Sequence, residues 1–373
     1  MSLPIVDLSG TPFDQGLTHG RSLAPRIRHN VDLYFERFRR EVGLDRPAVR
    51  EIASVYADAI RRANAGYFSE MEGVAEGCGI DFIDIAALNV RYEILYYQFG
   101  KIALELQARR ERGELPPGYE IDGCTAFALL PEATASGHLT IGQNWDWIPE
   151  VQGGVLRRDV DGHRSLGYTE AGIVGIKIGL NSAGIGLAIN GMTTTEDDWS
   201  RLAKPFHVRC YEILQARTFE EAAGVITDEP RSCSTNFLIA QTPDRVADLE
   251  AAPDKVNVLS CRDGCLTHAN HFVDPDALGI VEPPNDRRIF SRRREERLRE
   301  RLLAAVPVTV DAIQAALRDT TDDPFGLCRH RDPNVGPEEH YTTVTAVIMD
   351  LETKTLHLTD GAPDESEFET VTL

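Results

Sequence analysis

The sequence predicts an α+β fold in which antiparallel β-sheet is covered by helices. Apolar residues recur at helical spacing over the first third of the chain, whereas after about residue 120 they form short runs separated by Gly, Asn and Asp turns. Helical patterns then return before a final pair of strands. This order differs from the regular alternation of a doubly wound βαβ fold and favours sheet layers with helices packed on them.

The first 123 residues are expected to be mainly helical. Their apolar side chains recur every three or four residues, which places them on one face of successive helices. These positions are Leu23, Ile27, Val31, Tyr34, Phe35, Phe38, Ile52, Val55, Ile60, Met71, Val74, Phe82, Ile85 and Leu88. A loop containing Glu114, Pro116, Pro117 and Gly118 then leads to Gly123 and Cys124.

The rest of the chain reads as strands interrupted by helices. Predicted strands are Thr125 to Leu130, Leu139 to Gln143, Leu166 to Thr169, Ile173 to Leu180, Gly184 to Ile189, Asn236 to Ala240 and Val246 to Glu250. Predicted helices are Lys204 to Ala216, Phe219 to Ile226, Asp286 to Ala305 and Val310 to Leu317. A hairpin turning at Leu351 to Thr353 joins the last strands, Thr342 to Asp350 and Lys354 to Thr359.

Composition limits the possible partners. The chain has 373 residues, a formal net charge of -20 and an ordinary globular balance of 42% hydrophobic and 26% charged residues. A net anion repels phosphate backbones and anionic lipids, so we expect no nucleic-acid partner and no membrane partner. No apolar window approaches the ~18 residues of a membrane span, and Met1 to Gly10 does not resemble a secretory signal. A cytoplasmic location is therefore expected.

One basic cluster lies between Arg287 and Arg301, where Glu295, Glu296 and Glu300 alternate with arginines at helical spacing. This pattern is typical of a solvated helix face, and we interpret it that way in preference to a ligand site.

The cysteine pattern argues against disulfides and cofactors. Seven cysteines form an odd set without a CxxC pair, so reduced thiols are expected. Cys261, Cys265, His268 and His271 could ligate a metal, but an extended segment would point alternate side chains to opposite sides. There is no Gly-rich phosphate loop and no Gly-x-Ser-x-Gly motif. We expect no cofactor.

Two motifs carry a family resemblance. Asp122-Gly123-Cys124-Thr125-Ala126-Phe127 and Gly142-Gln143-Asn144-Trp145-Asp146-Trp147 resemble the isopenicillin N acyltransferase-like family, also called acyl-CoA:6-aminopenicillanic acid acyltransferases. This is a branch of the N-terminal-nucleophile (Ntn) hydrolases that also includes β-alanyl-amine hydrolases. Weaker matches at residues 10–20, 234–240, 267–272 and 327–330 extend the resemblance over nearly the whole chain.

The junction between Gly123 and Cys124 suits self-cleavage. Glycine lacks a β-carbon, so its carbonyl can be approached closely by the Cys124 sulfur. An N-to-S acyl shift followed by hydrolysis of the thioester would leave residues 1–123 and 124–373 as two chains. The new α-amino group of Cys124, with a pKa near ~8, could then act as the base for its own thiol.

The resemblance assigns two helpers to Cys124. Asp146 matches the family's carboxylate beside the nucleophile, which would hold the α-amino group by a charge-assisted hydrogen bond. Asn270 matches the asparagine whose amide donates to the oxyanion. For the basic residue that the related enzymes place near the nucleophile, Arg329, Arg331 and His340 are all candidates.

For the fold, the resemblance implies a four-layer αββα Ntn-hydrolase sandwich with two antiparallel sheets. Residues 1–123 would become a small subunit that stays bound to the catalytic large subunit, residues 124–373, within one domain. The implied activity is hydrolysis of N-acyl amines or N-acyl amino acids, or transfer of their acyl group to an amine. Two alternatives remain: a thiol hydrolase without self-cleavage that pairs Cys124 with His268 or His271, and a metal-binding protein built on Cys261 to His271.

Overall fold

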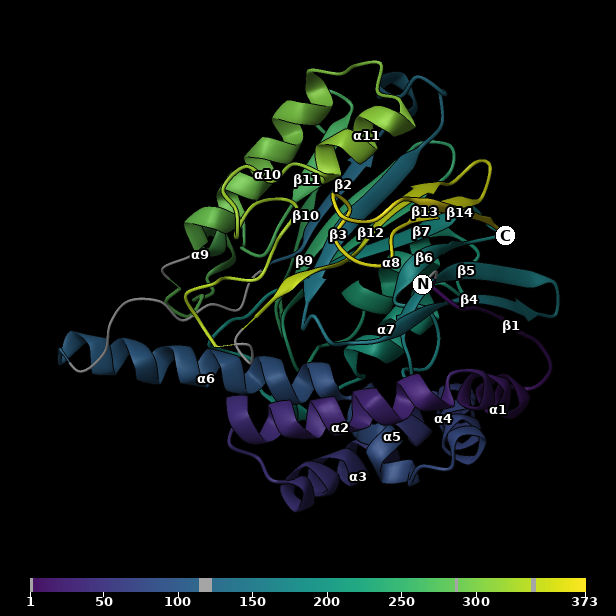
Figure 1. Cartoon of the computed structure of the whole chain (residues 1–373), viewed down its shortest axis with the longest axis vertical. Coiled ribbons are helices and arrows are strands. Elements are labelled where there is room, and N and C mark those ends of the chain that lie inside the picture. Colours follow the sequence, from purple (N-terminus) through teal and green to yellow (C-terminus); the bar gives the residue numbers. More distant parts are fainter. Residues whose placement is uncertain (1–2, 114–122, 286–287, 337–339) are drawn as a thin grey trace.

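The computed structural model describes residues 3–113, 123–285, 288–336 and 340–373, and within them two β-sheets pack face to face. The loop expected around Pro116, together with Asp122 and the start of the helix expected at Asp286, lies outside the described residues. The strands of both sheets run between helical layers, and the N-terminal helices lie across one end of the strands (Figure 1).

The smaller sheet carries the Gly123–Cys124 junction. Its strand order is β11-β2-β3-β12-β13-β14, and every pair is antiparallel. The strands are β2 (Thr125–Leu129), β3 (Thr140–Trp147), β11 (Cys265–His268), β12 (Thr342–Asp350), β13 (Thr355–Leu358) and β14 (Glu369–Thr372). Strands β2 and β3 are buried along their whole length, which explains their nearly continuous apolar or neutral character.

The larger sheet has the order β1-β4-β5-β6-β7-β8-β9-β10. Its strands are β1 (Ile5–Leu8), β4 (Gly153–Val160), β5 (His163–Glu170), β6 (Ile178–Asn181), β7 (Ile185–Gly191), β8 (Thr235–Gln241), β9 (Arg245–Ala251) and β10 (Val256–Leu259). All its pairs are antiparallel except β1 with β4. The two sheets meet where β2 and β3 pack on β7 and β8.

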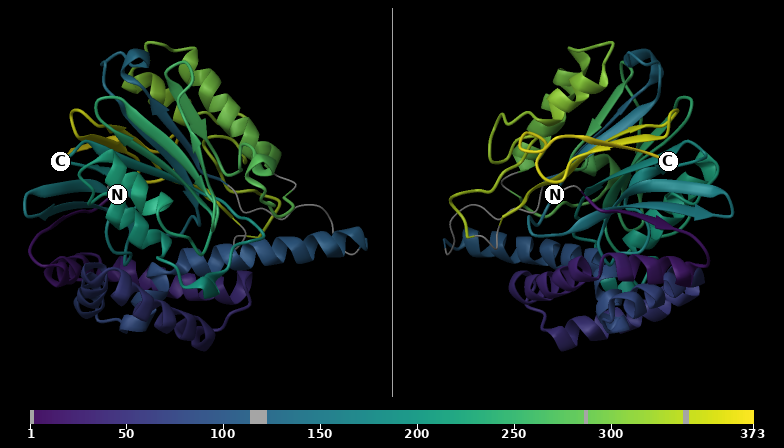
Figure 2. Two further views of the ribbon diagram at one scale, coloured as in Figure 1. Left: turned by 180° about the vertical axis from the view of Figure 1, so that it is seen from behind. Right: turned by 45° about the vertical axis from the view of Figure 1, so that its right-hand side comes forward.

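Helices cover the outer faces. Helices α10 (Arg288–Leu303) and α11 (Val310–Leu317) place Leu298, Leu302 and Ile313 against Phe127 and Ile348 of the smaller sheet. Helices α7 (Phe206–Ile213) and α8 (Phe219–Thr227) pack with the larger sheet, and a short helix α9 (Pro275–Leu278) precedes α10. The views from two further sides show the same succession of layers (Figure 2). The αββα sandwich expected from the sequence is confirmed.

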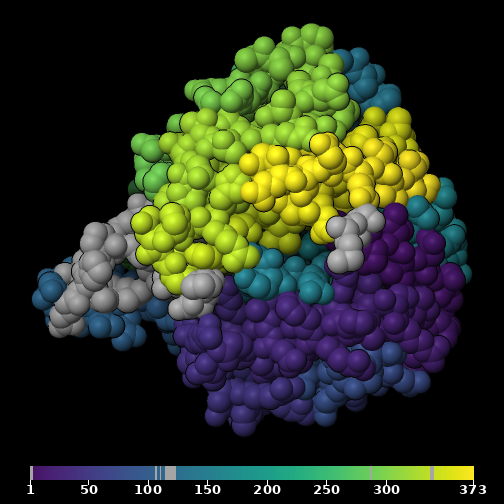
Figure 3. All heavy atoms as spheres, viewed as in Figure 1, coloured from purple at the N-terminus to yellow at the C-terminus, as the bar shows by residue number. Residues whose placement is uncertain are grey.

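The first third of the chain is helical, as predicted. It contains α1 (Pro12–Ser22), α2 (Ala24–Glu41), α3 (Arg46–Ala63), α4 (Ala65–Cys78), α5 (Phe82–Asn89) and α6 (Arg91–Glu111). These residues form the lower part of the molecular surface (Figure 3). Strand β1 also comes from this third, and it hydrogen-bonds into the larger sheet beside β4. The N-terminal residues are thus built into both a helical layer and a sheet.

Two details differ from the sequence-based expectations. The strand expected from Ile173 begins only at Ile178, because Gly172 and Gly175 adopt left-handed backbone conformations and hold residues 171–177 in turns. Strands β1, β4, β10 and β14 were not predicted, and β11 was expected only as an extended segment. Strand β4 mixes glycines and charged residues, and the other four strands are only four residues long. Among the described residues, no helix is both long and apolar enough to cross a lipid bilayer.

Candidate active site

Cys124 is buried directly before β2, one of the central strands of the smaller sheet. The β2–β3 register pairs Thr125 with Asn144, so one further step places Cys124 beside Trp145. The thiol donates a hydrogen bond to the backbone oxygen of Asp146 at 3.6 Å. Burial, followed by the negative charge of Asp146, raises the pKa of the Cys124 thiol to about 12. The thiol is therefore protonated at neutral pH unless a base removes its proton.

Gly123 fits against Asp146 because it has no side chain. A β-carbon at position 123 would lie 2.5 Å from the Asp146 Cβ, which is far inside van der Waals contact. The Asp146 carboxylate is fixed in turn by Thr343, whose hydroxyl donates to Oδ1 at 2.7 Å. Thr343 also accepts a hydrogen bond from the backbone N–H of Arg329 at 2.9 Å. The close approach of Gly123 and Asp146 is thus maintained by residues of β12 and of the segment before it.

Asn270 binds the same junction from the other side. Its side-chain Oδ1 accepts a hydrogen bond from the Gly123 N–H at 3.1 Å, while its Nδ2 donates to the Gly191 oxygen at 2.9 Å. An amide nitrogen carries two hydrogens, so a second donor remains for an oxyanion. The structure brings Cys124, Asp146 and Asn270 together around Gly123, although they come from three separate parts of the sequence.

The residue that orients Asn270 is one that the sequence analysis assigned to a solvated helix face. Arg294 of α10 is buried, donates to Asn270 Oδ1 at 3.1 Å and contacts the Thr125 hydroxyl at 3.3 Å. Its charge also favours the Cys124 thiolate. The solvated-face interpretation is wrong for this residue. Helical spacing could have identified Arg294 as buried, because it places this residue on the same face of α10 as Leu298 and Leu302.

The three candidates for the activating basic residue have other partners. Arg329 is buried, and its Nε donates to the Tyr341 oxygen at 3.1 Å. Arg331 is half exposed and pairs with Glu150 at 3.3 Å, and His340 Nε2 contacts the Asp332 oxygen at 2.9 Å. Lys177 and Arg294 are described cations whose charge lowers the pKa of the Cys124 thiol. The choice among the three candidates stays a prediction. Lys177 was missed because its sequence neighbours read as a plain apolar strand.

The histidines of the alternative interpretations bind carboxylates and a hydroxyl. His268 Nε2 lies 3.1 Å from Glu250 Oε1. Burial lowers the pKa of His268, but Asp248 and Glu250 outweigh burial and raise it to about 9. His271 contacts the Ser291 hydroxyl and Glu295. Neither ring is positioned as a partner of the Cys124 thiol in the described contacts. The possible metal cluster lies wholly within the described residues, but no three of its members bring their ligand atoms close together; its members are Cys261, Cys265, His268 and His271.

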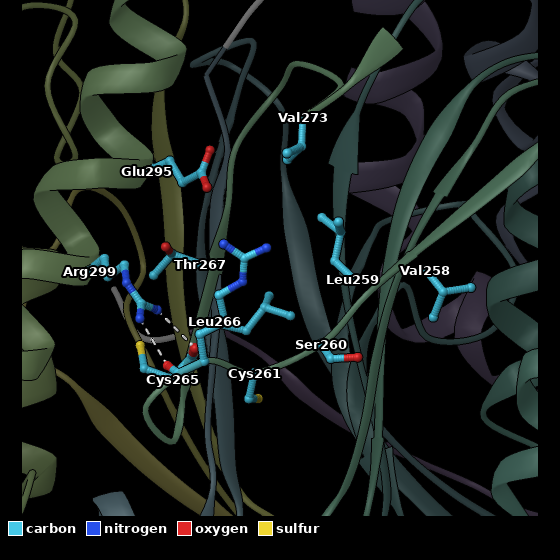
Figure 4. Close-up of a pocket in the computed structure, with 11 residues that line it drawn as sticks. Val258, Leu259, Ser260, Cys261, Cys265, Leu266, Thr267, Val273, Glu295 and Arg299 are labelled. Carbon is cyan, nitrogen blue, oxygen red and sulfur yellow. Dashed lines mark hydrogen bonds between the residues drawn. The ribbon is translucent and has the colours of Figure 1, made fainter. Parts of the chain in front are cut away.

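Two cavities lined by described residues bear on the surroundings of the site. One of about 390 Å³ lies between β10, β11 and α10, with Cys261, Leu266 and Glu295 in its walls (Figure 4). Cys265 pairs with Leu129, at the end of β2 remote from Cys124, so most of this cavity lies away from the junction. A second cavity, of about 540 Å³, includes Thr343, the partner of Asp146, together with Arg329 and Arg331. The second cavity is adjacent to the candidate site.

Two largely antiparallel sheets between helical layers form the αββα sandwich that the resemblance to Ntn hydrolases implied. A family model described as acyl-coenzyme A:6-aminopenicillanic acid acyl-transferase matches residues 133–365. The chain belongs to this family of acyltransferase enzymes. The matched residues include Asp146 and Asn270 and begin after Cys124.

Individual relatives are distant. The 40 kDa form of acyl-coenzyme A:6-aminopenicillanic-acid-acyltransferase from Emericella nidulans is 24% identical over 336 residues, which cover 87% of this chain and 84% of that protein. Protein dcd1A from Dictyostelium discoideum is 25% identical over 62% of this chain and 54% of its own length.

Two solved structures match part of the chain. A variant of conjugated bile acid hydrolase from Clostridium perfringens has a TM-score of 0.45 and 16% identity, covering 67% of this chain and 97% of its own. The Caenorhabditis elegans ortholog of N-acylethanolamine-hydrolyzing acid amidase also has a TM-score of 0.45, with 13% identity, covering 67% of this chain and 100% of its own.

Proposed function

We propose that this chain is a cysteine amidohydrolase or acyltransferase that cuts its own Gly123–Cys124 bond and then acts on N-acyl amines or N-acyl amino acids. The observation that carries this proposal is the arrangement around Gly123. Its N–H is bound by Asn270, its Cα lies against Asp146, and the next residue is a buried thiol. An amide bond held so closely beside a nucleophile is positioned for attack.

The self-cleavage would proceed through a thioester. The Cys124 sulfur attacks the Gly123 carbonyl carbon, a C–S bond forms, and the C–N bond to Cys124 breaks with transfer of a proton to that nitrogen. Water then adds to the thioester carbonyl, releasing the Gly123 carboxyl group and the Cys124 thiol. The product carries an α-amino group whose pKa near ~8 lets it accept the thiol proton at neutral pH.

Substrate turnover would use the same residues as self-cleavage. The thiolate attacks the substrate's amide carbonyl, and the developing oxyanion accepts a hydrogen bond from the Asn270 amide. Asp146 would hold the α-amino group by a charge-assisted hydrogen bond. The acyl group leaves the sulfur by transfer to water or to an incoming amine.

The two chains would remain together as a heterodimer after cleavage. Strand β1 belongs to residues 1–123, yet it hydrogen-bonds to β4 over Ile5 to Leu8. Buried polar contacts also cross the junction, including Asn30 with the Gln152 and Ala171 oxygens. Separation would expose these groups, so we expect one particle under native conditions and two chains only in denaturant. Size-exclusion chromatography against a denaturing gel checks this expectation.

The direct test is intact mass and N-terminal sequencing of the full chain. We expect fragments corresponding to residues 1–123 and 124–373, the larger beginning Cys-Thr-Ala-Phe. Cys124→Ala should fold and stay whole, because it removes the nucleophile and only a small side chain. Cys265→Ala, which alters a buried cysteine on the neighbouring strand β11, is the matched control and should cleave normally. A single full-length wild-type species after prolonged incubation at neutral pH, or a cleaved Cys124→Ala chain, would contradict the proposal.

A further inference from the structure

A buried lysine faces Cys124 from the opposite sheet. Lys177 directly precedes β6, and its backbone N–H donates to the Tyr168 oxygen, which continues the β5–β6 pairing. Its Nζ lies 3.1 Å from the centroid of the Trp145 ring, and Trp145 is the cross-strand neighbour of Cys124. Since neighbouring residues on one face of a sheet have Cβ atoms about 5 Å apart, the ammonium and the thiol share one intersheet space. Lys177 and Cys124 also influence each other's protonation directly.

The charges around Lys177 are not balanced. Glu170 accepts hydrogen bonds from Lys177 Nζ at 2.7 Å, from Arg91 through a bidentate contact, and from the Tyr34 hydroxyl. One buried carboxylate is thus shared by two cations, and the guanidinium of arginine does not lose its proton. The ionisable groups that face Lys177 are Glu170 and Tyr168 of β5, Arg91 of α6, His207 and Cys210 of α7, and Cys124.

The excess positive charge around Glu170 favours loss of a proton from Lys177. Burial, opposed by Glu170 and reinforced by Arg91, lowers the pKa of Lys177 to about 7. The Glu170 pKa is lowered, because the attraction of Arg91 and Lys177 outweighs the effect of its burial. At neutral pH a large fraction of Lys177 is therefore neutral and carries a lone pair that can accept a proton.

The uncleaved chain lacks the base that the mature enzyme would use. Before cleavage the nitrogen of Cys124 is part of the Gly123–Cys124 amide and has no basic lone pair. Burial and the negative charge of Asp146 raise the pKa of the Cys124 thiol far above neutrality, so the thiol does not ionise unaided at pH 7. We propose that Lys177 accepts the thiol proton of Cys124 during self-cleavage, an inference that rests on the function proposed above.

The proton that Lys177 accepts is passed on to the leaving nitrogen during the same cleavage. It moves from Sγ to Lys177 Nζ as the sulfur attacks the Gly123 carbonyl carbon, and from the resulting ammonium to the Cys124 nitrogen as the C–N bond breaks. Water then hydrolyses the thioester. Nζ contacts Glu170 and the Trp145 ring in the described structure, so the transfer passes through a bridging water or a swing of the lysine chain. Once the α-amino group exists, it replaces Lys177 as the base.

Lys177→Met tests the proposal in the full chain. The variant keeps a long apolar side chain and leaves the Arg91–Glu170 pair with balanced charges, so we expect it to fold. Its self-cleavage at pH 7 should be about a hundredfold slower or more, the usual contribution of a general base. The wild-type rate should level off above about pH 7, whereas the rate of Lys177→Met should continue to rise with pH as the thiol itself ionises. Cleavage is followed by intact mass from the time of synthesis in a cell-free system.

Two further variants separate proton transfer from charge and from packing. Lys177→Arg retains the positive charge but accepts no proton, so it should remain as slow as Lys177→Met. The control variant Asp84→Asn removes another buried carboxylate shared by two cations, Arg46 and Arg50 of α3, and should cleave at the wild-type rate. Wild-type rates in Lys177→Met or Lys177→Arg, or an unchanged pH profile, would overturn this inference while leaving the proposed function intact. An uncleaved wild-type chain would overturn both.

Discussion

Two buried ion-pair centres join the N-terminal helices to the larger sheet, and they differ in their balance of charge. In the first, Arg158 of β4 pairs with Glu70 of α4 at 2.7 Å and also contacts Gln15. In the second, Glu170 is shared by Arg91 and Lys177. Both carboxylates are fully buried. The first centre has one cation for one anion, whereas the second has an additional cation beside a thiol.

The two centres shift the pKa values of their carboxylates in opposite directions. Burial raises the pKa of Glu70 despite the charge of Arg158, whereas two cations outweigh burial and lower the pKa of Glu170. Equal burial therefore leaves Glu70 and Arg158 as a structural ion pair, whereas it leaves Lys177 beside Glu170 as the proposed proton acceptor. The number of cations for each buried carboxylate distinguishes the two.

The largest expected effect comes from removing the carboxylate that serves two cations. Glu170→Gln leaves Arg91 and Lys177 without their anion, so we expect a loss of about 3–5 kcal/mol in the free energy of unfolding. Glu70→Gln should lower the free energy of unfolding by less, because burial of the charged Glu70 carboxylate is itself unfavourable, as its raised pKa shows. Denaturant unfolding of both variants measures this. Equal losses would show that the two centres do not differ in the way described.

A smaller effect should separate chemistry from stability. Asn270→Ala removes an oxyanion donor, worth about 3 kcal/mol in the activation barrier, so turnover should fall roughly a hundredfold while the substrate KM changes little. Asn30→Ala is the matched control, since it removes a buried amide that bridges the two segments at the Gln152 and Ala171 oxygens and has no assigned role in the chemistry. It should lower the melting temperature with turnover of the folded enzyme retained.

The assay for Asn270→Ala is amine release from a panel of N-acyl amines, including β-alanyl amines, aromatic acyl amides and N-acyl amino acids. Normal turnover by this variant on the best of these substrates would contradict the assigned donor, whatever happens to its stability.

The smallest expected effect is a pH dependence of opposite sign at the two centres. Glu170 has a lowered pKa, so its contribution to stability is present above its ordinary pKa of 4.5 and is lost as the pH falls below that value. Glu70 has a raised pKa, so its unfavourable burial is relieved as the pH falls. Between pH 7 and pH 4, Glu170→Gln should approach wild-type stability and Glu70→Gln should fall further behind it, by on the order of 1 kcal/mol. Unfolding curves at several pH values provide the measurement, and parallel trends would refute this assignment of charges.

Much of the fold could be predicted from the sequence because its signals are local. Helical spacing from Leu23 to Leu88 identified the N-terminal helices, and apolar runs identified β2, β3 and β12 of the smaller sheet. The same local information failed between Ile173 and Lys177, where apolar residues read as a strand but glycine conformations form a turn. A short apolar run does not distinguish a strand from a buried turn.

The sequence by itself was enough to predict the family and the sandwich, which are confirmed, whereas the Gly–Cys junction with Asp146 and Asn270 as its helpers stays a prediction. Only the tertiary structure decided which cations approach the thiol. Arg294 is one of many arginines on α10, and Lys177 stands in an apolar stretch, so neither carries a local mark of its role. Their positions depend on the packing of α10 on the smaller sheet and of one sheet on the other. Buried charges act through partners distant in sequence, and those partners become neighbours only when the layers assemble.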